Sequence, residues 1–533
     1  MIRNPILPGF NPDPSICRVG DEYFIATSTF EWQPGVRIHR SRDLANWELV
    51  ALPLDRADLL DMRGEPDSCG IWAPCLSHAD GLFWLVYTDV RRYDGNFKDA
   101  HNYVVTAPDV RGPWSARAHV NSSGFDPSLF HDDDGRKWFL NMLWDHRGGS
   151  VGGHPKSPSF GGILLQRWDA EARRLVGEPR NIFKGSAHGL VEGPHLSKRD
   201  DWYHLTVAEG GTGYRHAVTM ARSRAIEGPY ELHPAIHVVT SKDAPDAPLQ
   251  RAGHGQIVET PDGGTYMVHL CSRPLPGTRR SPLGRETAIQ RCIWRDGWLW
   301  LADGGAVPSA QVAAPDPAAD AASPEPERVD FRGLAKPPLA FQWPRTPETA
   351  RIFALGADGL RLFGRESIGS WFEQALVARR QEHFAYRAET EVAFDPVSIQ
   401  QAAGLTTYYN RHKFFFCGVT FREDVGRCLT LFGCEGDWPD GRLKFHLADP
   451  WPLPGAGAIS LAVECSGPTQ RFQIRDGGRW RDVGPALDAS LLSDEAGRGE
   501  HGSFTGNFVG MAAFDITGAG RPADFPRFSY EPK

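Results

Sequence analysis

Three acidic residues far apart in the chain share a local setting that could support chemistry. Asp13 and Asp126 each precede a proline and a short apolar run, and Glu192 precedes a Gly-Pro pair and a similar run. Carboxylates that meet in one pocket repel one another and are costly to bury, so such a cluster indicates a function. It suits a hard cation that needs six or more oxygens, or hydrolysis of a glycosidic bond by an acid and a base. The alternative is that each acid only starts a strand, since Asp is a common turn former.

Whether the acids converge depends on the elements that carry them, and these elements are repeated. Five segments share a polar start, a short apolar stretch, a charged turn and an aromatic-led strand. The leading aromatics, spaced by 60, 55, 64 and 64 residues, are Tyr23, Phe83, Trp138, Trp202 and Tyr266. Each unit is typical of a hairpin. Aromatics that follow at similar offsets, and that indicate outer strands, are Trp47, Trp114 and Tyr230.

A repeat of this length matches one blade of a β-propeller, which holds four strands. Five copies over residues 1–305 therefore predict a five-bladed β-propeller; a solenoid is the alternative, but its repeats are shorter. The innermost strands of a propeller surround a central channel, so equivalent positions of the blades face one another. We expect Asp13, Asp126 and Glu192 to meet there, with Trp72-Ala73 and His254 at the corresponding places of blades two and five.

The rest of the chain indicates a connector and a second β domain. In residues 306–327, 13 of 22 residues are Ala or Pro, which is too poor in large apolar side chains to pack a core. Residues 328–533 resume β-like alternation, for example at 389–394, and no long helical period is visible. About 200 residues of short strands predict a β-sandwich. The predicted fold class is all-β.

Composition and charge restrict the partners. The 533 residues include 58 Lys plus Arg and 66 Asp plus Glu, a net charge of −8, without a basic run. This argues against nucleic acid or an anionic membrane as a partner. No stretch approaches 18 apolar residues, no apolar leader is visible, and the nine cysteines form no C-x-x-C pair. We expect a cytoplasmic protein without a structural metal.

Longer motifs surround these acids and recur to the end of the chain. They are Asn11-Pro12-Asp13-Pro14-Ser15, Ile71-Trp72-Ala73-Pro74, Phe125-Asp126-Pro127-Ser128, Glu192-Gly193-Pro194-His195, Gly284-Arg285-Glu286-Thr287-Ala288 and Phe504-Thr505-Gly506. With them the chain resembles the two-domain β-xylosidases of glycoside hydrolase family 43 over nearly its whole length. The resemblance implies a five-bladed catalytic propeller, a concanavalin-like β-sandwich, and hydrolysis with inversion.

The resemblance also implies roles for the three acids. Asp13 matches the general base, Glu192 the general acid, and Asp126 the residue that orients the acid and tunes its pKa. Inverting pairs stand roughly 6.5–9.5 Å apart to admit water, a gap that opposite sides of a propeller channel can provide. A third carboxylate helps to keep Glu192 protonated, because like charges disfavour its ionisation.

Further residues match the family's substrate pocket. Arg285 matches an arginine that contacts sugar hydroxyls and an acid, and His254 is expected at the channel floor. Aromatic walls are matched by Phe30, Trp72 and Trp144, and an aromatic plug from the sandwich by Phe504. Taken alone, each also has an ordinary explanation, namely a surface arginine, a core histidine or a core aromatic ring. No cofactor is required, although some relatives hold a divalent cation, calcium, near this histidine.

The expected function is an exo-acting 1,4-β-xylosidase that releases xylose from the non-reducing ends of xylo-oligosaccharides. The alternatives are an α-L-arabinofuranosidase or a bifunctional enzyme, and a carbohydrate-binding propeller without catalysis. The family often forms homo-oligomers, so a dimer or tetramer is an expectation by resemblance.

Overall fold

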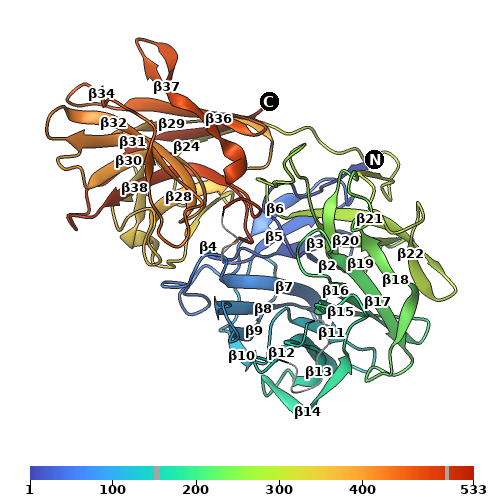
Figure 1. Ribbon diagram of the computed structural model, residues 1–533. Coiled ribbons are helices and arrows are strands. Elements are labelled where there is room, and N and C mark those ends of the chain that lie inside the picture. The colour runs from blue at the N-terminus through green and yellow to red at the C-terminus, as the bar shows by residue number, and fades with distance from the viewer. Residues whose placement is uncertain (149–156, 498–502) are drawn as a thin grey trace.

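The computed structural model describes residues 1–148, 157–497 and 503–533 and is built almost entirely of β-strands (Figure 1). Within the described residues the helical elements are two short 3-10 turns, η1 (Thr349–Arg351) and η2 (Ala489–Leu491). The predicted all-β fold is confirmed.

The first part of the chain forms five consecutive four-stranded antiparallel sheets. Blade one contains β2 (Ser15–Val19), β3 (Glu22–Thr27), β5 (Arg37–Ser41) and β6 (Glu48–Ala51). Blade two contains β7 (Gly70–Ala79), β8 (Leu82–Arg92), β9 (Asp99–Ala107) and β10 (Ala118–Asn121). Blade three contains β11 (Ser128–His131), β12 (Lys137–Trp144), β13 (Phe160–Asp169) and β14 (Arg174–Phe183). Blade four contains β15 (Glu192–Arg199), β16 (Trp202–Glu209), β17 (Ala217–Ser223) and β18 (Glu231–Thr240). Blade five contains β19 (Gln250–Glu259), β20 (Thr265–Ser272), β21 (Glu286–Arg295) and β22 (Trp298–Leu301).

The five sheets form a ring, because the first strand of each blade contacts the first strand of the next and β19 contacts β2. Tight turns connect strands as the sequence predicts. The pairs Asp80-Gly81 and Asp200-Asp201 have positive φ at both residues, the geometry of type I′ hairpin turns. The expected outer-strand aromatics are displaced, since Trp47 and Tyr230 directly precede β6 and β18 and Trp114 lies in the loop before β10.

The N-terminal segment closes the ring against blade five. Leu7 forms a β-bridge with Thr287, and the Asn11 N–H donates to the Arg285 carbonyl at 3.0 Å. Further out, β1 (Ile2–Arg3) pairs with β23 (Gln311–Val312). The predicted connector therefore contains a short strand, and its Val312 side chain is buried in the propeller core.

The second part of the chain packs two sheets face to face, with a smaller one beside them. The six-stranded sheet contains, in order, β24 (Glu327–Asp330), β40 (Arg527–Pro532), β29 (Ala385–Val392), β35 (Ile459–Ser466), β36 (Thr469–Asp476) and β37 (Arg479–Asp488). The larger sheet contains β33 (Lys444–Phe445), β32 (Gly426–Glu435), β31 (Lys413–Arg422), β30 (Gln401–Asn410), β38 (Phe508–Asp515), β28 (Ala375–Arg380), β25 (Phe341–Pro344) and β4 (Trp32–Gln33), with β34 (Trp451–Pro452) beside β32. A three-stranded sheet contains β26 (Phe353–Gly356), β27 (Gly359–Phe363) and β39 (Pro522–Phe525). Side chains in β29 alternate between half-buried and buried, as a strand with one face on a core requires.

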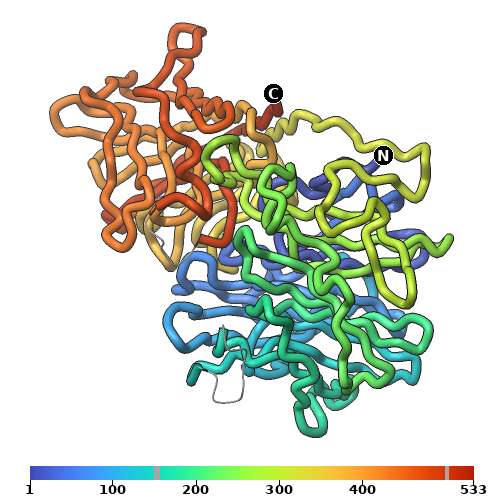
Figure 2. The backbone as a smooth tube through the Cα atoms, turned by 45° about the vertical axis from the view of Figure 1, so that its right-hand side comes forward, coloured from blue at the N-terminus to red at the C-terminus, as the bar shows by residue number. Residues whose placement is uncertain are grey.

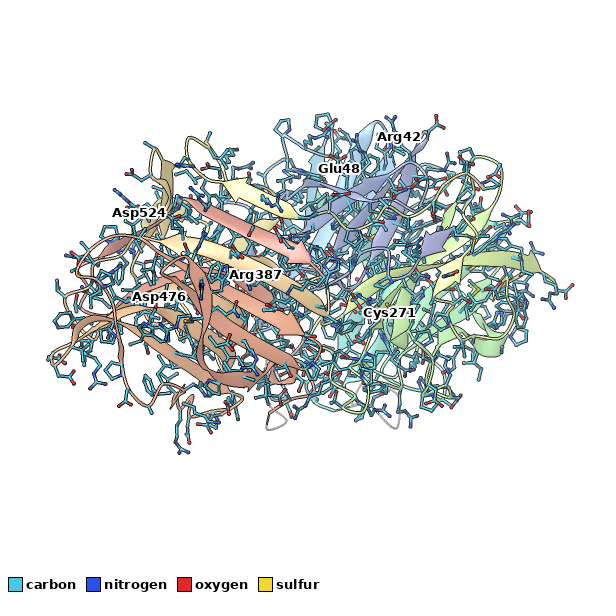
Figure 3. All side chains as sticks on the ribbon, turned by 90° about the horizontal axis from the view of Figure 1, so that it is seen from above. Arg42, Glu48, Cys271, Arg387, Asp476 and Asp524 are labelled. Carbon is cyan, nitrogen blue, oxygen red and sulfur yellow. The ribbon has the colours of Figure 1, made fainter. Side chains whose placement is uncertain are left out.

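The two domains lie side by side when seen from above (Figure 3). They share a sheet, since β4 of the propeller part pairs with β25 of the sandwich. The Trp32 ring stacks on Phe508 at 3.5 Å between centroids, in an apolar cluster that also holds Phe10 and Phe30. A loop of the sandwich approaches the loops of blade five (Figure 2). There the Asn507 N–H donates to the Pro282 carbonyl. Residues near Phe30 are therefore fixed by both domains.

Candidate active site

A cavity of about 190 Å³ lies where the first strands of the blades begin. It is lined by Asp13, Phe30, Trp72, Tyr93, Lys98, Phe125, Asp126, Phe160, Glu192, Gly211, Thr212, His254, Arg285 and Phe504. Eight of the nine site residues expected from the sequence are in this set, and the ninth, Trp144, is not. The volume is below the roughly 300–1,000 Å³ of pockets for drug-sized ligands, so it suits one small unit such as a single sugar ring.

Two kinds of propeller segment supply most of these side chains, and the sandwich supplies Phe504. One kind is the start of a blade's first strand, which carries Asp13, Asp126 and Glu192. The other is the loop that follows a blade's second strand. In each antiparallel pair the end of the second strand lies beside the start of the first, as Val90 lies beside Gly70 in blade two. Both kinds of segment therefore meet at the same end of the channel.

The backbone at the start of each blade takes the same unusual conformation. Residues with positive φ at this place are Asp13 (54°), Ala73 (35°), Asp126 (53°), Gly193 (55°) and His254 (49°). Asp13 and Asp126 are therefore equivalent, but Glu192 lies one residue before the equivalent position, which corrects the predicted alignment of the three acids. The equivalent residue of blade four is Gly193, where a Cβ atom would lie 2.8 Å from the His254 ring.

Asp13 is buried and both of its carboxyl oxygens accept a hydrogen bond. The Ser28 hydroxyl donates to Oδ2 at 2.7 Å, and Arg285 Nη1 donates to Oδ1 at 2.9 Å. Ser28 is fixed in turn, because its hydroxyl accepts the Ala73 N–H at 2.8 Å. A carboxylate with ordered donors on both oxygens is oriented and suits a base.

Arg285 joins the acid to the lid of the cavity. Its Nη2 donates to the Phe504 carbonyl at 2.9 Å while its Nη1 holds Asp13. The guanidinium also lies 5.1 Å from the centre of the Phe30 ring. The predicted contact between Arg285 and an acidic partner is present, although Arg285 and Asp13 are 272 residues apart in the chain.

The other two acids have pKa values that favour the protonated form. Burial raises the pKa of Glu192 to about 8, and the nearby Asp13 charge adds to this, while Arg285 and Lys98 oppose it. Burial also raises the pKa of Asp126 well above its usual range, followed by the charges of Glu192 and Asp13. A hydrogen bond from the Gly193 backbone to Asp126 acts in the opposite direction. The site thus combines the ion-paired Asp13 with Glu192, a carboxyl group that holds its proton near neutral pH.

Aromatic rings form the walls and the lid. Phe30 lies 5.9 Å from Trp72 and 6.5 Å from Phe504 between ring centres, and Trp72 lies 5.3 Å from Phe125. Phe504 comes from the sandwich, so the predicted insertion of this residue into the pocket agrees with the structure. Rings arranged in this way can pack against the apolar C–H faces of a sugar.

Trp144 does not line the cavity but packs behind two residues that do. Its indole N–H donates to the Asn96 carbonyl at 2.8 Å, and its ring packs 5.3 Å from Phe160 and 4.2 Å from the Lys98 ammonium. The expectation that Trp144 lines the pocket is therefore corrected. It supports two residues that do.

Lys98 is the most informative residue that the sequence analysis missed. It lines the cavity, donates to the Tyr93 carbonyl at 2.6 Å, and has a pKa lowered by burial while the Glu192 charge acts to raise it. Its position in the sequence could have predicted this, because Lys98 lies in the loop after the second strand of blade two, and the repeat places such loops at the mouth of the channel. The same rule identifies Tyr93 and Thr212.

His254 lines the cavity, and its surroundings do not resemble a calcium site. Burial lowers its pKa, Asp13 acts to raise it, and the Arg285 charge acts to lower it further. No group of three or more His, Cys, Asp or Glu able to hold a metal is present among the residues that the structure describes. Calcium prefers six to eight oxygen ligands, which these side chains do not supply beside a guanidinium. The calcium expectation has no support here.

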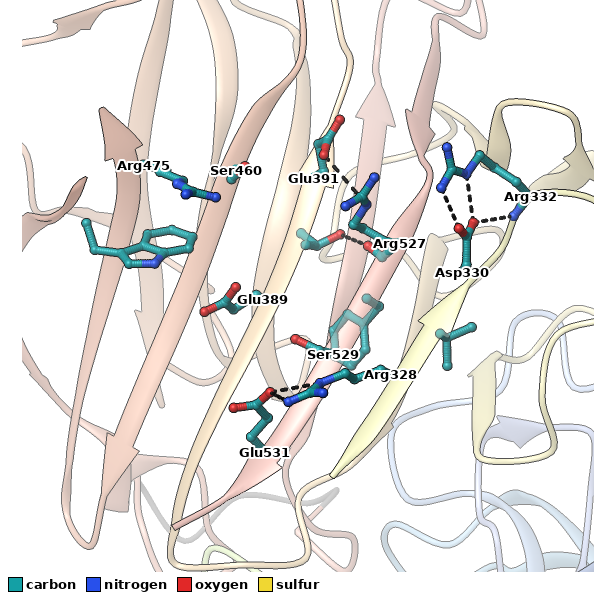
Figure 4. Close-up of a pocket in the computed structure, with 14 residues that line it drawn as sticks. Arg328, Asp330, Arg332, Glu389, Glu391, Ser460, Arg475, Arg527, Ser529 and Glu531 are labelled. Carbon is teal, nitrogen blue, oxygen red and sulfur yellow. Dashed lines mark hydrogen bonds and ion pairs between the residues drawn. The ribbon is translucent and has the colours of Figure 1, made fainter. Parts of the chain in front are cut away.

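A larger hollow of about 450 Å³ lies on the outer face of the six-stranded sheet (Figure 4). Most of its charged side chains pair with one another, as in Arg328 with Glu531 at 2.8 Å and Arg332 with Asp330. Opposite charges in alternation on a strand face are typical of a solvated surface. The buried carboxyl groups of the smaller cavity make it the candidate active site.

Among the described residues, helices long and apolar enough to cross a bilayer are absent.

Comparisons with known proteins agree with this geometry. A family model described as Glycosyl hydrolases family 43 matches residues 2–299, and one described as Beta xylosidase C-terminal Concanavalin A-like domain matches residues 328–531. A Humicola insolens protein named Xylosidase/arabinosidase 43B is 57% identical over 100% of this chain and 98% of its own length. A Bacillus subtilis (strain 168) protein named Beta-xylosidase is 45% identical over 100% of both. The crystal structure of a xylan beta-1,4-xylosidase from Bacillus halodurans C-125 has 48% identity and a TM-score of 0.95, over 100% of both chains.

Proposed function

Because the chain belongs to glycosyl hydrolases family 43 and is therefore an inverting glycoside hydrolase, we propose that it releases xylose from the non-reducing ends of β-1,4-xylo-oligosaccharides. The observation that supports this most is the small cavity that combines the ion-paired Asp13 with Glu192, whose raised pKa keeps it protonated. Relatives similar over their whole length carry xylosidase names. A cavity with room for one sugar ring, covered by Phe504, favours attack at a chain end.

In this proposal Asp13 is the general base and Glu192 the general acid. Glu192 gives its proton to the glycosidic oxygen as the bond from that oxygen to C1 breaks. Asp13 takes a proton from a water molecule whose oxygen attacks C1 from the opposite face of the ring. The products are an α-xylose and an oligosaccharide shortened by one unit, so atoms and charge balance. These steps use only side chains and water.

The environment of each acid suits its role. A pKa of about 8 keeps Glu192 protonated at neutral pH, as a general acid requires. The Glu192 charge raises the pKa of Asp126, so the two carboxyl groups interact, and we propose that Asp126 orients Glu192 and tunes it. Asp13 differs because Arg285 and Ser28 donate to its oxygens, which leaves a carboxylate ready to accept a proton.

The remaining lining residues bind the terminal sugar in this proposal. Arg285 and His254 offer polar contacts at the channel floor, and a guanidinium suits sugar hydroxyls because its donors form a rigid fork. Phe30, Trp72 and Phe504 supply apolar faces.

Proton NMR of xylobiose during hydrolysis tests the proposal. Early appearance of α-xylose is expected from inversion. Early β-xylose would contradict the roles of Asp13 and Glu192, since retention requires a nucleophile. Absence of reaction would contradict the substrate and leave the catalytic groups to be tested on another pentose.

An α-L-arabinofuranosidase activity is the second candidate. One observation favours it, because the 57% identical relative is named for both activities. Comparison of kcat/KM for matched aryl β-xylosides and α-L-arabinofuranosides decides between them. A higher value for the arabinofuranoside would reverse the preference that we propose.

A further inference from the structure

Ser68 lies behind the pocket wall and contacts three parts of it. Its hydroxyl accepts the Phe504 N–H at 3.0 Å, and its carbonyl accepts the Trp72 indole N–H at 2.9 Å. Its own N–H donates to Glu31 Oε2 at 2.9 Å, next to the wall residue Phe30. Ser68 is fully buried and does not line the cavity. It therefore touches the groups that shape the site without facing the substrate.

The backbone of Phe504 is held on both sides. Ser68 accepts its N–H, and Arg285 donates to its carbonyl from Nη2 at 2.9 Å and from Nε at 3.3 Å. The same guanidinium donates to Asp13. A continuous chain of hydrogen bonds thus runs from Ser68 through the Phe504 peptide groups and Arg285 to Asp13.

The segment that carries Ser68 is anchored by the sandwich. Arg345 Nη2 donates to Asp67 Oδ1 at 2.7 Å, and Arg411 Nε donates to Asp67 Oδ2 at 3.0 Å. Arg345 Nε also donates to the Glu65 carbonyl at 2.7 Å, and its side chain is 1% exposed. Two arginines that pair with both oxygens of one carboxylate hold the loop in one geometry.

The backbone of Ser68 is itself constrained. Its φ of 59° is uncommon for a residue other than glycine. Such a conformation costs free energy and persists where the surroundings determine it strongly. Here the three hydrogen bonds of Ser68 and the two arginines that bind Asp67 hold the backbone in this conformation.

We propose that Ser68 is a positioning residue, whose hydroxyl sets the Phe504 main chain and through it the orientation of Arg285 and Asp13. The inference rests on the proposed role of Asp13 as the base. In this proposal the sandwich contributes to the catalytic site through the Phe504 main chain as well as through the Phe504 ring.

Two variants separate the hydroxyl from the backbone. Ser68→Gly removes the hydroxyl and relaxes the backbone, because glycine adopts positive φ readily. Ser68→Ala removes the hydroxyl and keeps the strained φ. Both should lower kcat/KM by about tenfold, the effect of one lost buried hydrogen bond. The loss should be equal on xylobiose and on an aryl xyloside with a good leaving group, since the base acts on both and the acid matters mainly for the first.

Amide hydrogen exchange supplies a readout independent of turnover. In both variants the amides of residues 503–507 should exchange faster, while those of β30 and β31 in the sandwich should not change. The matched control is Ser272→Ala, because Ser272 is also fully buried and its hydroxyl has no hydrogen-bond partner among the described residues. That variant should leave both kinetics and exchange at 503–507 unchanged.

Each remaining outcome decides against the inference. Wild-type kinetics in Ser68→Gly with a defect only in Ser68→Ala would assign the effect to backbone strain. Unchanged exchange at 503–507 would mean that the hydroxyl does not hold Phe504. If the wild-type protein turned over no xyloside, the proposed function would fail, and the exchange experiment would still test the hydrogen bond.

Discussion

Replacing Glu192 by glutamine should raise the free energy of unfolding by an amount that depends on pH. The pKa of this buried carboxyl is raised from 4.5 to about 8, first by burial and then by the Asp13 charge. Below pH 4.5 the folded and unfolded chains both hold the proton. As the pH rises toward 8 the unfolded chain releases it and the folded chain keeps it, so stability is lost over that range. At about 1.4 kcal/mol for each pH unit, the loss is roughly 3 kcal/mol at pH 7.

Thermal unfolding of the wild type and Glu192→Gln between pH 4.5 and 8 measures this effect. Glutamine does not titrate, so the difference between the two midpoints should increase by several degrees in favour of the variant as the pH rises. Turnover of xylobiose should fall by about 100- to 10,000-fold, the usual contribution of a general acid. An aryl xyloside with a good leaving group should lose far less, because its leaving oxygen needs little protonation.

Glu209→Gln is the matched control in the same blade. Glu209 is fully buried and accepts hydrogen bonds from the Ser186 N–H at 2.7 Å, the Ser186 hydroxyl at 2.6 Å and the Thr219 hydroxyl at 2.6 Å. Its replacement should destabilise the protein at every pH. A difference for Glu192→Gln that stays constant from pH 4.5 to 8 would refute the raised pKa, and unchanged xylobiose turnover would refute the assignment of the acid.

Two further predictions concern the same groups. The value of kcat/KM should fall as the pH rises through about 8, where Glu192 loses its proton. Lys98→Met should move this fall to higher pH, because the Lys98 charge lowers the pKa of Glu192. A fall at the same pH in the variant would exclude an effect of Lys98 on Glu192. Asp13→Asn should reduce turnover of xylobiose and of an activated aryl xyloside by similar factors, and a defect confined to xylobiose would contradict its role as the base.

Much of the architecture could be predicted because a propeller repeats a local pattern. Strand pairing within one blade is close in sequence, and aromatic-led hairpins recur at intervals near 60 residues. Equivalent positions then converge by symmetry, so the sequence alone predicts that Asp13 and Asp126 lie in one pocket. The offset of Glu192 was not predictable in the same way. It depends on close packing of Gly193 against the His254 ring, and such contacts leave no periodic signal.

Residues that connect the two domains are even harder to predict from the sequence. Ser68 lies in a connection between blades that belongs to no repeated strand, and its partners are 436 residues away in Phe504 and 37 away in Glu31. Lys98 could have been found from the loop rule, whereas Ser68 could not. Hydrogen bonds to main-chain groups do not depend on the partner's side chain, so residue types alone do not reveal them.

The domain arrangement explains why the proposed base is oriented by residues from both ends of the chain. The N-terminal segment runs beside blade five, and this places Asp13 next to Arg285. The guanidinium has two further donor atoms, Nε and Nη2, and both point at the Phe504 carbonyl of the sandwich. A propeller without that carbonyl would leave buried charged donors unsatisfied, which costs free energy and allows the arginine to turn. The sandwich therefore closes the pocket with a ring and also completes the hydrogen bonds that hold Asp13 in place.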